Sequence, residues 1–375
     1  MRGPARAGRT KFDLGDIVRD HRADLERVRD LRTHEQRVLT AIERCRTAAL
    51  GGHLDRCSDC DFERPSYNSC RNRHCPKCQA LAQEAWIEGE RRRLLPLPHF
   101  HVVFTVPAEL RPLARFAPRA FYDELFAAVR DTLAGFAKRR LRAQLGATLV
   151  LHTWKRDLLF HPHIHAIVSA GGLSLDGERI VRSRSPDYLF PVAALGKVFA
   201  AKMKSHLSRA HEERLFAGFS AFDDPVGFVR LLRSIRHEGW NVYAKKPFDD
   251  ASHVVSYLGR YTHRVGISNS RLLYVTPTAV VFRTKGEGVA STTPVDFLQR
   301  FLLHLLPTGF HKIRHIGLYA SPLKRSVAAA LLGRDGIRAP RDAPARYEPP
   351  PRSCPLCRAA LLLVPLARAP PSTTP

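Results

Sequence analysis

The spacing of apolar residues predicts a chain that mixes helices and strands. Apolar positions recur at helical intervals among charged residues in several segments. These segments are 11–50, 79–95, 109–144, 193–215, 226–236, 251–262 and 294–304. Runs rich in β-branched and aromatic residues predict strands elsewhere. The expected strands are 99–106, 147–153, 161–169 and 240–244, with a hairpin at 271–283 that turns at Thr276-Pro277. Strands interleaved with helices, without strict alternation, favour the α+β fold class.

The charge balance indicates a polyanionic partner. The chain has 60 Lys and Arg against 35 Asp and Glu, a net charge of +25, and its 44% apolar content is sufficient for a folded core. Lys and Arg that bind phosphates release condensed counterions, so DNA is the expected partner. A GC-rich genome would also raise the arginine count, and charge alone therefore does not decide the function.

No segment suggests a membrane or secretion. The longest apolar run, at 359–367, is interrupted by Pro365 and is far shorter than the roughly 20 residues of a membrane span. No apolar stretch follows the basic N-terminus, as a secretion signal requires. We therefore expect a soluble protein of the bacterial cytoplasm, associated with the nucleoid.

Five of the eight cysteines are clustered between residues 57 and 78. In a chain without a secretion signal, metal ligation is favoured over disulfide bonds. Two CxxC pairs separated by fourteen residues can surround one Zn²⁺ tetrahedrally, which predicts a structural site. The predicted ligands are Cys57, Cys60, Cys75 and Cys78, with Cys70 and His74 as alternatives.

Three further cysteines lie outside these two pairs and the Cys70 position. Cys45 falls inside the first helical segment and is interpreted as a small buried apolar side chain. Cys354 and Cys357 form another CxxC pair near the C-terminus. This pair is either half of a second site or binds no metal.

The segment His161-Pro-His-Ile-His165 predicts a metal-binding strand. Residues two apart on a strand share a face, so His161, His163 and His165 would project together. Neutral imidazoles in this arrangement bind divalent cations. Pro162 cannot donate to a sheet, so the strand should begin or bulge there.

A tyrosine pair, Tyr257 and Tyr261, is the second candidate for chemistry. A spacing of four stacks both phenols on one face of a helix, and Arg260, His263 and Arg264 add groups suited to phosphate. With a metal polarising a phosphodiester, a phenolate can attack phosphorus and leave a 5′-phosphotyrosine and a free 3′-OH. Because no hydrolysis occurs, the DNA strand can be rejoined elsewhere.

These motifs resemble a known family. His163-Ile-His165 is similar to the His-hydrophobe-His motif of HUH nucleases, and Tyr257 with Tyr261 to their two-tyrosine class. The cysteine-rich stretch 45–78 resembles the zinc-binding domain of rolling-circle insertion-sequence transposases. Further similar segments are 100–107, 257–269, 300–307 and 314–318, so the resemblance covers residues 30–320. It implies a transposase that nicks one strand, moves single-stranded DNA and needs Mg²⁺ or Mn²⁺.

The resemblance also implies a division of the chain. Residues 1–95 would form a small helical and zinc-binding domain that recognises DNA. Residues 96–325 would form the two-tyrosine HUH catalytic domain, a central antiparallel sheet flanked by helices. The remaining tail, 326–375, is rich in Pro and Arg, and we expect it to be loosely ordered apart from its one CxxC pair.

The third ligand of the catalytic metal stays open at this point. HUH enzymes take a third polar ligand from outside the motif, for which His161 is geometrically simplest. Asp157, His152 and His253 are alternatives. His99-Phe-His101 repeats the His-hydrophobe-His spacing, but the later motif is favoured for its third histidine and the glycines that follow it.

Other functions fit parts of the sequence. A tyrosine recombinase would use His311, Arg314 and Tyr347, although that class needs no metal. A metallohydrolase would leave the tyrosine pair without a role. A non-catalytic zinc-dependent DNA-binding protein, or a relict transposase, would have no role for the histidine strand or for the tyrosines. A replication initiator or relaxase would share the preferred chemistry.

Overall fold

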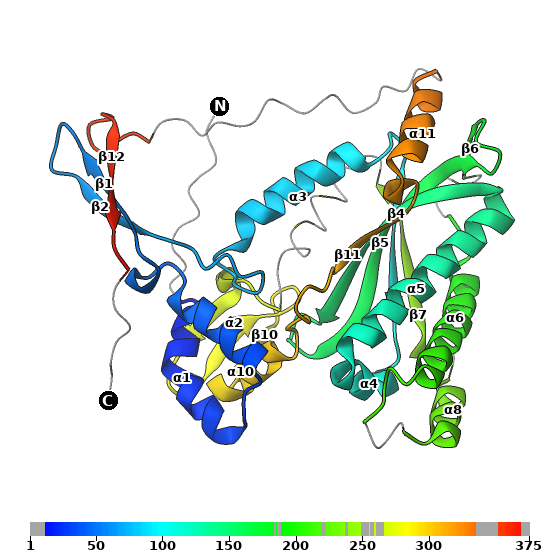
Figure 1. Ribbon diagram of the computed structural model, residues 1–375, viewed down its shortest axis with the longest axis horizontal. Coiled ribbons are helices and arrows are strands. Elements are labelled where there is room, and N and C mark those ends of the chain that lie inside the picture. The colour runs from blue at the N-terminus through cyan, green and yellow to red at the C-terminus, as the bar shows by residue number, and fades with distance from the viewer. Residues whose placement is uncertain are drawn as a thin grey trace.

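A large antiparallel sheet is the centre of the molecule. The computed structural model describes residues 12–183, 185, 189–218, 223–236, 239–248, 255, 259, 266–334 and 352–368. Its six-stranded sheet has the order β11-β4-β5-β3-β7, with β6 paired to β5 (Figure 1). The strands are β3 (His99–Thr105), β4 (Ala143–Trp154), β5 (Phe160–Ser174), β6 (Ile180–Arg182), β7 (Asn241–Phe248) and β11 (Ile313–Gly317). The predicted α+β class is confirmed.

Four helices cover one face of this sheet. They are α4 (Arg111–Phe116), α5 (Pro118–Phe136), α6 (Val192–Glu212) and α8 (Pro225–Ser234). Period-two alternation sends Ile164, Ala166 and Val168 of β5 into the shared core, where all three are fully buried. Phe104 of β3 meets Phe199 of α6 edge to face, with ring centroids 5.2 Å apart. The alternate residues of β5 therefore face the other side.

The central strand β5 agrees with its prediction at its start and extends beyond it at its end. At its start, His152 of β4 pairs with His163 and Trp154 pairs with Phe160, so the register shifts across Pro162 as predicted. At its end, the strand continues through Gly171 and Gly172 to Ser174, beyond the predicted limit. A Cβ at Gly172 would lie 2.0 Å from the Gln144 oxygen. These glycines permit close strand contact instead of ending the strand.

Among the described elements, two helices cover one end of the opposite face. There α3 (Gln79–Arg93) and α11 (Pro322–Arg334) pack around Ile167 of β5 and Tyr319. The Tyr319 hydroxyl bonds to His99 Nε2 at 2.5 Å, and its ring lies against Gly146 in β4. A Cβ at Gly146 would come within 2.7 Å of that ring.

The N-terminal helices share a core with a distant part of the chain. Helices α1 (Leu14–Val28) and α2 (Thr33–Arg44) pack against α10 (Pro294–Leu302) and a small sheet of β8 (Leu272–Val275), β9 (Val280–Arg283) and β10 (Val289–Thr292). The predicted hairpin is β8–β9. The boundary predicted at residue 95 therefore does not coincide with a separation of cores.

The tail returns to the N-terminal part of the molecule. Strand β12 (Leu361–Leu366) pairs with β1 (Gly52–Cys57), which also pairs with β2 (Glu63–Tyr67), and this sheet lies apart from the large one (Figure 1). The expectation of a loosely ordered tail is wrong for residues 361–366. Backbone pairing to β1 supplies the order that their composition does not predict.

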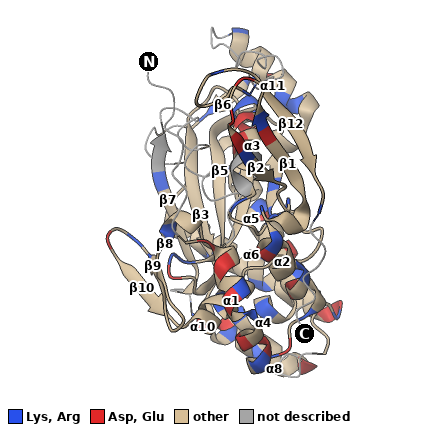
Figure 2. Cartoon of the chain, turned by 90° about the vertical axis from the view of Figure 1, so that its left-hand side faces the viewer, with Lys and Arg blue, Asp and Glu red and all other residues tan. Residues whose placement is uncertain are grey.

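Charges of both signs share the helical surfaces. Figure 2 shows acidic and basic residues intermingled on α1, α2 and α3, and pairs such as Arg22 with Glu26 are within salt-bridge distance. Exposed pairs of this kind contribute little to stability. Within the part of the chain that the structure describes, no helix is long and apolar enough to cross a bilayer.

We predict that Gly146→Ala lowers the free energy of unfolding by about 1–3 kcal/mol, because the added methyl group overlaps the Tyr319 ring. Gly89→Ala is the matched control. It lies in α3 with no atom near its Cβ position, so alanine should stabilise the helix by about 0.5–1 kcal/mol. Thermal denaturation of both variants measures the difference. An unchanged melting temperature for Gly146→Ala would contradict this packing.

Candidate metal centre

Three histidines from two adjacent strands converge at the end of the large sheet that α3 and α11 leave open. His163 and His165 project from β5, and His152 projects from the neighbouring position on β4. One nitrogen from each lies within 4.8 Å of the others. The Nε2 atoms of His163 and His165 are 3.1 Å apart. A divalent cation fits between three such donors.

Hydrogen bonds orient two of these imidazoles. His163 Nδ1 donates to the His161 carbonyl oxygen at 2.7 Å, which leaves Nε2 as its acceptor nitrogen. His165 Nδ1 lies 2.8 Å from His101 Nε2 on β3, and donation to His101 leaves its own Nε2 directed at the cluster. Such partners fix the tautomer and ring orientation of metal-binding histidines. His101 belongs to the competing His99-Phe-His101 motif. In the structure it orients the His165 ring of the cluster.

Burial keeps the cluster neutral. It lowers the pKa of His163 to about 4 and holds the pKa values of His152 and His165 well below their ordinary 6.5, and neighbouring histidines add to the effect at those two positions. Burial, with help from Lys245, also lowers the pKa of His101 to about 4. Unprotonated imidazoles have lone pairs available for a cation at neutral pH.

The third member of the cluster is His152 instead of His161. The His161 ring points elsewhere, with its Nδ1 3.4 Å from the Arg111 guanidinium. The Asp157 carboxylate accepts from the Leu159 backbone N–H at 3.0 Å. His253 lies outside the described residues. The pairing of His152 with His163 across β4 and β5 explains why strand neighbours, not sequence neighbours, complete the cluster.

A cavity of about 760 Å³ opens beside the three histidines. It is lined by Lys155 and Arg156 from the β4–β5 turn and by Lys285 from the β9–β10 turn. These cations suit a phosphate backbone, and the imidazoles lie on the cavity wall. The site therefore combines three convergent imidazoles with an entrance lined by cationic side chains.

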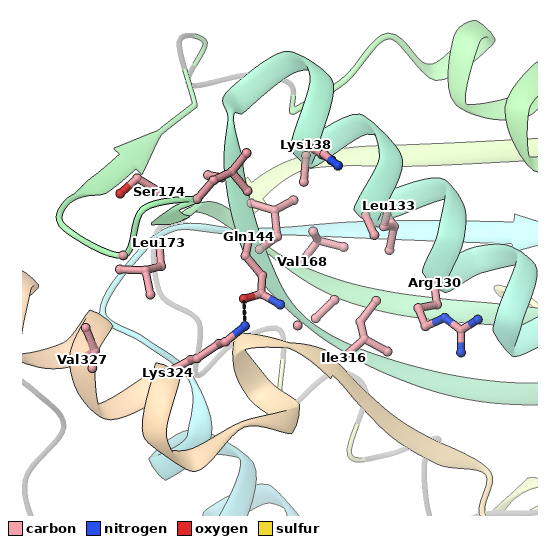
Figure 3. A pocket seen from close by; sticks show the side chains of 18 of the residues that line it. Arg130, Leu133, Lys138, Gln144, Val168, Leu173, Ser174, Ile316, Lys324 and Val327 are labelled. Carbon is pink, nitrogen blue, oxygen red and sulfur yellow. Dashed lines mark hydrogen bonds between the residues drawn. The ribbon is translucent and has the colours of Figure 1, made fainter.

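A second cavity, of about 750 Å³, lies between α5, β4 and α11 (Figure 3). Its wall is largely aliphatic, including Leu133, Val168 and Ile316. Lys324 donates to Gln144 at 2.9 Å across it. No metal-binding cluster was found beside it among the described residues. The histidine cavity is therefore the better candidate for chemistry.

The predicted tyrosines fall in a segment that the structure describes only in part. Tyr257 and Tyr261 lie outside the described residues, as do Arg260, His263 and Arg264. Val255 and Gly259 are described and are helical. Val255 is fully buried in one cluster with Ile167, and a Cβ at Gly259 would overlap Ile87 of α3.

One cysteine cluster lies at the base of the N-terminal helices. It contains Cys45, Cys70, Cys75 and Cys78. Cys78 Sγ lies 3.4 Å from that of Cys45 and 3.5 Å from that of Cys70. The prediction that Cys45 is only a packing residue is wrong. His74 is not a member, because its Nε2 accepts the Leu306 backbone N–H at 3.2 Å.

The other cysteine cluster corrects the predicted zinc site. Cys57 and Cys60 join Cys354 and Cys357, not Cys75 and Cys78. Strand β1 separates the two clusters, since its six residues extend about 17 Å. The closeness of five cysteines in the sequence suggested one zinc site. The structure has two separate clusters of four cysteines each.

Two family models match parts of the chain. Residues 17–106 match a family described as "Transposase zinc-binding domain", and residues 146–326 match one described as "Putative transposase". "Putative transposase y4qJ" of Sinorhizobium fredii is 40% identical over 350 residues, which cover 87% of this chain and 88% of the relative.

A second relative is named for a mobile element. "Transposase for insertion sequence element IS801" of Pseudomonas savastanoi pv. phaseolicola is 30% identical over 306 residues, which cover 78% of this chain and 72% of that protein. No solved structure matches the chain.

We predict that His152→Ala weakens Mn²⁺ binding by at least about 10-fold, because it removes one of three donors. His161→Ala is the control, since its ring is turned toward Arg111 and should change affinity little. Isothermal titration of the purified protein with Mn²⁺ compares them. Equal losses in the two variants would contradict the assignment of the third donor.

We also predict that the metal-free protein loses stability in mild acid. Burial lowers the pKa values of His101, His163 and His304 from 6.5 to about 4, so the unfolded chain binds protons that the folded chain does not. Stability should be retained above pH 6.5 and fall toward pH 4. At pH 5 the loss should be about 2 kcal/mol for each imidazole.

Urea denaturation at pH 7.5 and pH 5 measures this loss. His304→Gln serves as the control. Because glutamine does not titrate, the free energy of unfolding of this variant should fall less between pH 7.5 and pH 5. Equal unfolding free energies of the unmodified protein at the two pH values would contradict the burial of neutral imidazoles.

Proposed function

Since the chain belongs to the IS91-type family of insertion-sequence transposases, we propose that it cuts and rejoins single-stranded DNA through a 5′-phosphotyrosine. DNA is its partner, and transposition is its biological activity. The finer proposal assigns the nucleophiles to Tyr257 and Tyr261 and the metal ligands to His152, His163 and His165.

The observation that carries the proposal is the histidine cluster at a cation-lined cavity. The donors His152, His163 and His165 are mutually within 4.8 Å and are neutral at pH 7. A protein that only holds DNA has no need for three convergent neutral imidazoles beside a cavity. Lys155 and Lys285 line the same cavity, and their charges suit the phosphates of a DNA backbone.

The donor set fits a divalent cation. Imidazole nitrogen is a softer ligand than carboxylate oxygen, so three histidines favour Mn²⁺ over Mg²⁺. A bound ion would polarise the scissile phosphodiester as a Lewis acid. His101, by accepting from His165 Nδ1, keeps that ligand in its binding tautomer.

The tyrosine pair supplies the covalent step. One phenolate oxygen attacks phosphorus, the bond to the 3′ oxygen breaks, and the released 3′ end takes a proton. The reverse attack by a 3′-OH rejoins a strand and frees the tyrosine. A second tyrosine permits a second transfer before the first is resolved, and Arg260, Arg264 and His263 are proposed to bind the flanking phosphates.

The position of Val255 supports a tyrosine near the metal centre. Val255 stands two positions before Tyr257 in the chain and packs in one cluster with Ile167. Ile167 follows His165 by two residues and shares its face of β5. The described part of this segment is therefore anchored on the sheet face that carries the histidines.

The recombinase alternative finds less support. The Arg314 guanidinium stacks on Phe126, 4.2 Å from the ring centroid, and pairs with Asp123. Through these contacts the Arg314 side chain packs β11 against α5. Tyr347, the nucleophile in that alternative, lies outside the described residues.

We predict that the Tyr257→Phe/Tyr261→Phe double variant loses covalent attachment to DNA by at least about 1,000-fold, because no phenolate remains to attack phosphorus. Each single variant should retain cleavage but lose the coupled second transfer. The assay incubates the protein with labelled single-stranded oligonucleotide and Mn²⁺, and detects the denaturation-resistant adduct.

Tyr274→Phe is the matched control, because Tyr274 is an exposed tyrosine of β8. DNA binding, measured by fluorescence anisotropy, should persist in all four variants. Full adduct formation by the double variant would show that another residue is the nucleophile.

A further inference from the structure

The cysteine cluster that joins the two ends of the chain has the geometry of a metal site. Cys57 Sγ lies 3.4 Å from Cys357 Sγ, and Cys60 Sγ lies 3.6 Å from Cys354 Sγ. All four sulfur atoms are mutually within 4.8 Å. A tetrahedral zinc site with Zn–S bonds of about 2.3 Å has S–S edges of about 3.8 Å. These separations are close to those of a tetrahedral tetrathiolate site.

Both CxxC turns use the same local hydrogen bond. The Asp59 backbone N–H lies 3.4 Å from Cys57 Sγ, and the Leu356 N–H lies 3.4 Å from Cys354 Sγ. In each turn the donor is two residues after the first cysteine, so the two halves of the cluster are alike. N–H donation of this kind stabilises a thiolate more than a thiol.

The backbone after the second C-terminal cysteine is strained. Arg358 directly follows Cys357 and has a φ of +67°, which is unfavourable for a residue with a Cβ. Its N–H donates to the Cys354 carbonyl oxygen at 2.9 Å, closing the turn. Strain of this kind persists only where the surroundings impose it.

The small sheet has no apolar core of its own among the described residues. No side chain of β1, β2 or β12 except Cys57 and the Asp55 carboxylate is buried, and Leu362 and Leu363 are more than half exposed. The three hydrophobic clusters of the described chain contain none of its residues. A sheet without an apolar core needs a crosslink or a metal to fold.

An ionic contact also brings the tail to β1. The Asp55 carboxylate is fully buried and lies 2.9 Å from the Arg64 guanidinium on β2 and 3.1 Å from that of Arg352. Arg352 stands two residues before Cys354. The tail is therefore held to β1 by backbone pairing and by charge as well as by the cysteines.

We propose that Cys57, Cys60, Cys354 and Cys357 bind a second structural Zn²⁺, which closes the N-terminal zinc-binding module with the end of the chain. The module is thus discontinuous in sequence, and residues 17–106 contain only half of this site's ligands. Four thiolates leave no coordination position for a substrate, so the ion is structural. This proposal does not depend on the nuclease chemistry of the histidine cavity.

The first test uses the unmodified full-length protein loaded with zinc. Bound zinc should protect Cys354 and Cys357 from alkylation, and a chelator should make both reactive, as peptide mass spectrometry would record. Cys357 is the decisive residue, because its side chain is exposed and only a metal would protect it. Equal alkylation rates with and without zinc would overturn the proposal.

The second test counts the sites. In the Co²⁺-substituted protein, sulfur-to-cobalt charge-transfer absorption reports thiolate ligands only, so the histidine centre does not contribute. Cys354→Ala/Cys357→Ala should halve this absorption and lower the bound zinc by about one ion per chain. Leu356→Ala, an exposed position inside the same turn, should change neither.

Two results would overturn the proposal. Zinc content and cobalt absorption unchanged in the double cysteine variant would mean that these thiols hold no ion. Two disulfide bonds in the protein purified under reducing conditions, detected by mass, would mean that the cluster is a redox crosslink.

Discussion

The two-residue period of strand β5 is the constraint on which the rest of the structure depends. Ile164, Ala166 and Val168 enter the core under α5 and α6, and this burial fixes the strand's orientation. His163 and His165 must then face the other side, where none of the described helices covers that end of the sheet. The core energy of one face thus sets the position of the histidine cluster on the other.

Much of this arrangement could be predicted from the sequence, because it is local. The β-branched pattern predicted the strands, Pro162 predicted the shift in register, and the spacing of His163 and His165 predicted two members of the histidine cluster. The contributions of His152 and His101 were missed or undervalued, because they depend on which residues of β4 and β3 lie beside β5. Strand register is a property of the whole sheet and has no local signature.

The cysteines show the same limit over a longer range. The spacing of CxxC pairs favours ligands that are close in sequence, and it therefore grouped Cys57 with Cys75. Cys57 instead lies beside Cys354 and Cys357, because β12 pairs with β1. The composition of β12 alone does not predict this pairing. Likewise, the core of α1 and α2 is completed by residues 267–302, which no motif in the N-terminal region indicates.

The pairing of β12 with β1 has a consequence for synthesis of the protein. Cys357 is made 300 residues after Cys57, so β1 and β2 leave the ribosome long before their partner strand exists. A prematurely terminated product would carry the histidine centre but not a finished N-terminal module. Completion of that module therefore requires translation as far as Leu366.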